Sequence, residues 1–173
     1  MRSWIIILLT LASFPCFAQQ GYNYFSISGG LYHPEMVIGE MSLEFGQKYY
    51  RMWEVNFDYA HRERMTTFTI PPTTEEGEPT FGERREIVNS FKGGIIYKPV
   101  LFRSRNTMLS FRTGASLGTN THQFIAGATA GFEFSFMTKQ GIVLFLRQKN
   151  EVVFWDDDTW RVGGLVGLKV PLN

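Results

Sequence analysis

The sequence predicts an all-β fold: an eight-stranded antiparallel up-and-down transmembrane β-barrel of the outer-membrane type. Three observations predict it. Apolar and polar residues alternate along eight segments, and a period of two is the signal of a β-strand. The chain begins with an apolar stretch typical of a secretory signal peptide. The connections between segments are short on one side and longer on the other, which fits periplasmic turns and extracellular loops.

The first 18 residues are expected to be a cleaved signal peptide, which leaves residues 19–173 as one barrel domain in the outer membrane. Arg2 supplies the positive start, and residues 4–14 form an apolar run of the length a signal peptide needs. That run is too short to cross a bilayer as a helix, which takes roughly 20 residues. A cut after Ala18 removes the single cysteine and leaves no thiol chemistry.

Cys16 has a second interpretation, as the lipid-modified cysteine of a lipoprotein signal. Pro15, directly before it, is not the small residue that such a site expects. The sequence therefore favours a cleaved, unlipidated chain.

The eight segments follow one another along the chain as residues 24–32, 37–45, 53–59, 90–98, 109–117, 128–136, 142–149 and 160–172. In the first four, the apolar faces carry, in order, Phe25 and Ile27, Met41 and Leu43, Val55 and Phe57, and Phe91 and Ile95. Their opposite faces carry Ser26 and Ser28, Glu40 and Glu44, Glu54 and Asp58, and Ser90 and Lys92.

The last four segments repeat the pattern. Their apolar faces carry, in order, Leu109 and Phe111, Phe132 and Phe134, Leu144 and Leu146, and Val166 and Leu168. The opposite faces carry Ser110 and Arg112, Glu133 and Ser135, Arg147 and Lys149, and Arg161 and Lys169.

The polar faces are expected to point inward. An eight-stranded barrel has an interior just large enough to be filled by side chains, so small and polar residues suit it and bulky apolar residues suit lipid. The alternative is a soluble barrel such as a lipocalin, which is apolar inside and polar outside.

Charged side chains in a narrow lumen should pair, because burying one alone costs several kcal/mol. The predicted interior charges are Glu40, Glu44, Glu54, Asp58, Lys92, Arg112, Glu133, Arg147, Lys149, Arg161 and Lys169. Neighbouring strands are about 4.8 Å apart, so Glu133 should pair with Arg112 or Arg147. Glu54 or Glu40 should meet Arg161 or Lys169 across the lumen. These pairs predict a salt-bridged plug; the alternative is a polar path for ions, or a gate.

Aromatic residues gather at the predicted strand ends, where outer-membrane barrels carry two interfacial girdles. The predicted girdle residues are Tyr24, Tyr32, Trp53, Tyr59, Tyr97, Trp155 and Trp160. The longest connection, residues 64–85, is expected to be an extracellular loop. Its prolines, Pro71, Pro72 and Pro79, discourage strand pairing.

The residues predict no catalytic site, no cofactor and no metal site. His33, His61 and His122 lie near strand ends without a nucleophile motif or metal spacing. A lipid-modifying enzyme remains an alternative, with Ser116 near His122. Acidic residues in 64–85 and 156–158 are interpreted as solvated loops, with divalent-cation binding as the alternative. The balanced charge argues against direct nucleic-acid binding.

Several stretches resemble the conjugal transfer protein TraO family, which is encoded by conjugative transposons of Bacteroides-type bacteria. They are the signal peptide ending in "AQ", "SFKGGIIYKPVLFRSRNTMLSFRTGASLG", "GIVLFLRQK" with Arg147, and the closing "WRVGGLVGLKVPLN". The matched positions are Gly93, Gly94, Tyr97, Gly114, Ala115, Ser116, Gly118, Gly163, Gly167, Lys169 and Asn173.

The resemblance implies a non-enzymatic outer-membrane component of a conjugative DNA-transfer apparatus. Its implied partners are outer-membrane lipid and other envelope proteins of the transfer machine. The matched positions are glycines and strand residues, so none implies a catalytic role. The chain departs from the family in lacking a cysteine near the start of the mature protein. The remaining alternative is a small barrel for envelope stability or adhesion.

Overall fold

A computed structural model describes residues 23–47, 51–70, 80–156 and 158–172. The predicted signal peptide and the centre of the predicted loop, residues 71–79, lie outside the described residues. Within the described ranges, no helix is long and apolar enough to cross a membrane.

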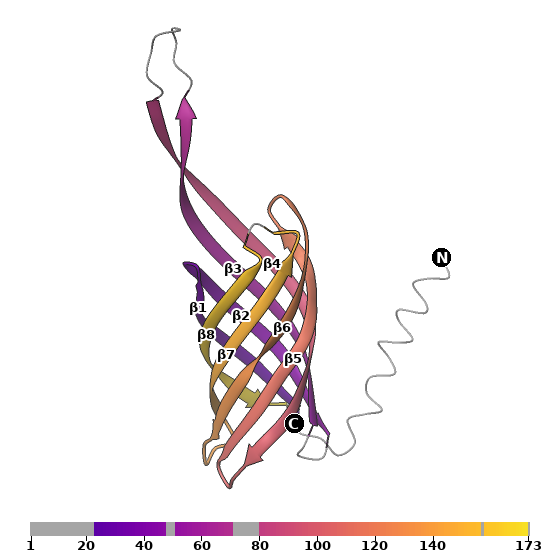
Figure 1. Cartoon of the computed structure of the whole chain (residues 1–173). Helices are drawn as coiled ribbons and strands as arrows, with labels where there is room; N and C mark the ends of the chain where they lie inside the picture. The colour runs from indigo at the N-terminus through magenta and orange to yellow at the C-terminus, as the bar shows by residue number, and fades with distance from the viewer. Residues whose placement is uncertain (1–22, 48–50, 71–79, 157, 173) are drawn as a thin grey trace, which may run out of the picture.

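The described chain is a closed antiparallel barrel (Figure 1). Its strands are β1 (Asn23–His33), β2 (Met36–Gln47), β3 (Arg51–Ile70), β4 (Thr80–Arg103), β5 (Thr107–Asn120), β6 (Gln123–Met137), β7 (Val143–Phe154) and β8 (Trp160–Pro171). Each strand pairs with its neighbours in the sequence, and β1 pairs with β8 to close the ring. The predicted fold class is confirmed.

The alternation along β6 shows which side of the wall is polar. Phe132 and Phe134 are 47% and 49% exposed on the outside, whereas Glu133 and Ser135 are 0% and 2% exposed inside. Phe132 stands opposite Phe111 of β5, with ring centroids 5.4 Å apart, and these rings form part of the outer apolar surface. Apolar residues outside and polar residues inside exclude the lipocalin-like alternative, whose pattern is the reverse.

The interior also holds a small apolar layer. It consists of Tyr32, Met36, Ile38, Ala60 and Leu165, all at most 3% exposed. Their strands are adjacent, because Ile38 stands opposite Ala60 and also opposite Gly30, which in turn faces Leu165. The lumen is therefore filled by side chains at this level as well as at the charged levels.

The prediction of a loop over residues 64–85 is wrong for residues 64–70 and 80–85, which belong to strands. β3 runs to Ile70 and β4 starts at Thr80, and the two pair along their length. Figure 1 shows this pair rising well beyond the other strands. Threonines and Phe68 favour strand structure here, and Phe68 covers Gly82, where an added Cβ would stand 2.6 Å from the Phe68 ring. The prolines behind the prediction lie outside the described residues.

Candidate functional site: the charged interior

All eleven predicted interior charges have side chains at most 2% exposed. The wall strands place them there by alternation, since each stands on the polar face of its strand. Two further buried charges, Lys98 and Glu151, belong to the same interior but were missing from the predicted set. The signal was present: Lys98 shares the polar face of β4 with Lys92, and Glu151 follows Lys149 by two positions.

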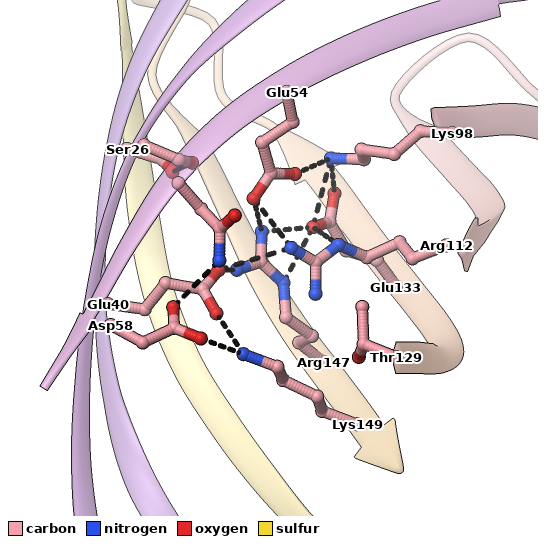
Figure 2. A network of polar contacts seen from close by, with 12 residues as sticks. Ser26, Glu40, Glu54, Asp58, Lys98, Arg112, Thr129, Glu133, Arg147 and Lys149 are labelled. Carbon is pink, nitrogen blue, oxygen red and sulfur yellow. Dashed lines mark hydrogen bonds and ion pairs between the residues drawn. The ribbon is translucent and has the colours of Figure 1, made fainter. Parts of the chain in front are cut away.

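Glu133 is the centre of one charge layer, the lower layer, which lies farther from the β3–β4 extension and which Figure 2 draws in its upper half. Its carboxylate accepts hydrogen bonds from Arg147, at 2.6 Å from Nη2 and 3.0 Å from Nε. Lys98 Nζ donates to the same carboxylate at 2.9 Å, and Lys169 donates as well. Arg112 Nε lies 3.8 Å away. The predicted pairing of Glu133 with Arg147 is confirmed, and Glu133 connects charges from four other strands.

Arg112 joins this layer to the opposite wall. Its Nη2 donates to Glu54 at 2.5 Å and to Glu40 at 3.1 Å. Lys98 lies 3.0 Å from Glu44 and 3.3 Å from Glu54. The lower layer therefore contains four acids and four bases: Glu40, Glu44, Glu54, Glu133, Lys98, Arg112, Arg147 and Lys169. Its formal charge is zero.

A second layer lies closer to the β3–β4 extension than the first, and Figure 2 draws it below the first. Lys149 Nζ donates to Asp58 at 2.5 Å and to Glu40 at 2.9 Å, which links the two layers (Figure 2). Lys92 pairs with Glu151, both 1% exposed. Two acids, Asp58 and Glu151, thus face two bases, and this layer is also neutral.

The connection between β7 and β8 closes the far end. Asp156 accepts hydrogen bonds from Arg161 and, at 3.2 Å, from Asn120 of β5. Asp158 pairs with Arg62 of β3. The acidic segment 156–158 was interpreted as a solvated loop, and this is wrong for Asp156 and Asp158: Asp156 pairs with the buried Arg161, and Asp158 pairs with the half-buried Arg62. Asp157 lies outside the described residues.

The predicted pairing of Glu54 or Glu40 with Arg161 or Lys169 is wrong. Lys169 instead pairs with Glu44, at 2.7 Å, and with Glu133. The register explains this: Lys169 stands opposite Ser26, which faces Ser42, so Lys169 lies near the level of Glu44. Arg161 stands opposite Glu151 near the other end of the barrel and pairs with Asp156.

Five of the seven predicted girdle residues face outward, as a girdle requires. Trp53, Trp155 and Trp160 are at least half exposed, and Tyr59 is 38% exposed. Tyr97 is half-buried, with its ring centroid 5.0 Å from that of Trp53.

Tyr24 and Tyr32 are not girdle residues, because both are buried in the interior. They share the parity of Ser26 and Ser28 in β1, so their position at the strand ends was misleading and the alternation was the better guide. Tyr32 donates to Glu151 at 3.4 Å and its ring lies 5.9 Å from Lys149 Nζ.

Ser116 and the histidines differ in exposure and in hydrogen-bond partners. Ser116 is buried and donates to Glu151 at 3.4 Å. His122 is exposed in the turn between β5 and β6. The His61 ring is 2.7 Å from the side-chain oxygen of Asn89. Ser116 thus faces the interior, whereas His122 is exposed in a turn.

One group of carboxylates has the spacing of a metal site. Ligand atoms of Glu44, Glu54 and Glu133 lie within 4.8 Å of one another. The Lys98 ammonium stands within 3.3 Å of all three, and so supplies the positive charge that a cation would bring.

Comparisons with known proteins bear on the fold of this chain and on nothing else. No family model and no curated protein matches the chain. A de novo designed transmembrane β-barrel is 12% identical, with a TM-score of 0.51, over 89% of this chain and 98% of that one. The outer membrane enzyme PagL is 11% identical, with a TM-score of 0.45, over 86% and 99%. The Yersinia pestis outer membrane protein Ail is 13% identical, with a TM-score of 0.46, over 88% and 100%. The likeness to the designed barrel concerns the fold alone.

Proposed function

We propose that the protein is a non-enzymatic outer-membrane barrel with a closed interior, which serves as a component of a conjugative DNA-transfer apparatus. The observation that carries the closed interior is the neutral, layered ion-pair network. The transfer role is supported by the resemblance of residues 90–118 and 160–173 to the TraO family.

The network supports an anchoring role over a transport role. An ion crossing the lumen must separate pairs such as Lys149 with Asp58 or Glu133 with Arg147. Breaking a buried pair costs about 3–5 kcal/mol, and several stand in series. Each layer is neutral, so the lumen offers no net charge to attract an ion of either sign. In this proposal the barrel wall anchors the protein in the membrane, and the segments outside the membrane contact the other components.

A gene deletion tests the transfer role. Loss of the protein should lower the frequency of conjugative transfer from the donor, and expression of the full chain should restore it. The protein should float with outer-membrane fractions and change its gel mobility on heating. Unchanged transfer in the deletion strain would remove conjugation from the proposal, and recovery from the soluble periplasm would remove the membrane placement.

Envelope stability or adhesion is the second candidate, and the exposed β3–β4 extension favours it. Met65, Phe81 and Ile87 are each at least 47% exposed there. Conjugation genes beside this one favour transfer, and a deletion strain with normal transfer but altered detergent sensitivity or aggregation favours adhesion.

A histidine test addresses catalysis. Joint replacement of His33, His61 and His122 by alanine should leave outer-membrane lipid composition as in wild type. A change in acyl-chain or headgroup composition would restore the enzyme alternative.

A further inference from the structure

The outer ends of β3 and β4 form a two-stranded ribbon outside the barrel wall. β2 pairs with β3 only as far as Arg62, and β5 pairs with β4 only from Ser90. Residues 63–70 and 80–87 therefore pair with each other alone (Figure 1). A lone two-stranded ribbon is marginally stable in water, and both of its edges are open to another strand.

The hydrogen-bonding direction of the β4 edge follows from Asn89. Its N–H donates to Thr121 Oγ1 at 3.2 Å, and its carbonyl accepts from Thr121 N at 3.0 Å, so Asn89 points these groups away from β3. Backbone direction alternates along an antiparallel strand. Ile87, Arg85 and Glu83 therefore also point their N–H and C=O groups out of the edge, as does Phe81.

The side chains of these four residues are self-complementary. In an antiparallel pair of two β4 edges centred on Arg84, Glu83 of each copy faces Arg85 of the other, and Phe81 faces Ile87. Opposite charges and apolar pairs directly across a ladder both stabilise it. Phe81 and Ile87 are 73% and 47% exposed in one copy, so this pairing would cover them.

We propose that a second copy of this chain binds here, edge to edge through residues 81–87, to form a four-stranded sheet. One contact opposes it, because Arg84 faces Arg84 of the second copy. Glu86 of that copy lies diagonally beside it, within reach of a long side chain. A parallel pairing brings like residues close together and lacks the reciprocal match between Glu83 and Arg85.

The geometry also fixes which copies meet. Two barrels in one membrane are related by an axis along the membrane normal, which preserves the upward direction of a rising strand. The β4 edges of two barrels in one membrane therefore both point away from that membrane, and they can meet only in a broadly parallel direction. An antiparallel pair requires the second ribbon to descend from an apposed membrane. The pairing is thus a contact between two facing outer membranes, and it rests on the proposed outer-membrane placement with the ribbon outside the cell.

A charge-swap experiment tests the register. The full protein is reconstituted into two liposome populations with different fluorophores, and their aggregation is followed by energy transfer. Glu83→Arg places two Arg–Arg contacts in each pair, and Arg85→Glu places two Glu–Glu contacts. Each variant alone should aggregate about tenfold less than wild type. Liposomes of one variant mixed with liposomes of the other should recover, because both contacts between residues 83 and 85 are then between opposite charges.

Arg85 also pairs with Glu63 within one chain, so Arg85→Glu could weaken the ribbon itself. Recovery in the mixture controls for this, because a damaged ribbon would not recover when the partner variant is added. A mixture no better than the two variants alone would overturn the proposal, as would wild-type liposomes that do not aggregate above lipid alone.

A cysteine experiment in detergent locates the contact without membranes. In a Cys16→Ser background, Arg84→Cys should oxidise to a disulfide-linked dimer, because residue 84 faces itself. Glu86→Cys is the matched control: its partner in the other copy is Gly82, so it should give at least fivefold less dimer. Equal cross-linking at both positions, or none at residue 84 in protein that keeps its heat-modifiable mobility, would contradict the pairing. Neither result depends on conjugation or on the state of the lumen.

Discussion

Replacing Glu133 by glutamine should destabilise the barrel more than any single change on its outer face. The fully buried Glu133 carboxylate accepts hydrogen bonds from Arg147, Lys98 and Lys169. Glutamine keeps the size of the side chain and removes its charge, so the lower layer is left with three acids and four bases. Breaking a buried pair in this way costs about 3–5 kcal/mol.

That loss corresponds to roughly two to four orders of magnitude in the folding equilibrium. It should appear as a lower urea midpoint for refolded protein in lipid vesicles and as loss of the folded gel band at a lower temperature. Phe132→Leu is the matched control, since Phe132 is the outward-facing neighbour and both side chains suit hydrocarbon.

A second change sharpens the test. Lys98→Met in the Glu133→Gln background restores three acids and three bases, so the double variant should lose less stability than the sum of the two single variants. If Glu133→Gln is no more damaging than Phe132→Leu, or if the two losses add, the ion-pair network does not hold the lumen together.

Three further outcomes follow from particular contacts. Gly118→Ala should block or slow folding, because its Cβ would stand 1.9 Å from the Phe91 carbonyl oxygen, whereas Gly39→Ala meets nothing within 4 Å and should refold like wild type. The hydrogen bond from Arg85 lowers the pKa of the exposed Glu63 carboxyl. This pair should therefore hold the ribbon together above the ordinary glutamate pKa of about 4.3 and be lost as pH falls through the lowered value, which a carboxyl carbon NMR titration would show. Asp156→Asn should weaken the closure at the end of the barrel that carries the β3–β4 extension, seen as faster amide exchange in the β7–β8 connection with the urea midpoint of the barrel nearly unchanged.

Alternation made most of this fold predictable. A strand has only two faces, so Glu133 between Phe132 and Phe134 fixes which face is polar. The composition of the polar faces then fixes that side as the interior, because a narrow barrel cannot hold rows of bulky residues in addition to charges. Every inward charge that was predicted is buried for this reason.

Partner choice within the lumen was not predictable in the same way. Strand tilt and stagger set the height of each residue around the ring, and neither can be counted from one strand. Lys169 therefore meets Glu44 rather than Glu54, and Arg161 meets Asp156. Tyr32 was assigned to the outer girdle because it lies at a strand end, although its alternation with Ser26 and Ser28 already placed it inside.

The ribbon was missed because prolines dominated the prediction for residues 64–85. Proline removes a ladder hydrogen bond only where it stands. The threonines and Phe68 on the β3 side carry their own strand preference, and Gly82 gives the Phe68 ring a place to pack.

The closed lumen is tested most directly by ion conductance. Wild-type protein, refolded and shown to be heat-modifiable, is added to a planar lipid bilayer, with a porin in the same bilayer as the positive control. The layered ion pairs predict no stable conducting level at any modest voltage. A steady, ohmic conductance from the folded wild-type protein would contradict a plugged interior and would make the barrel a channel.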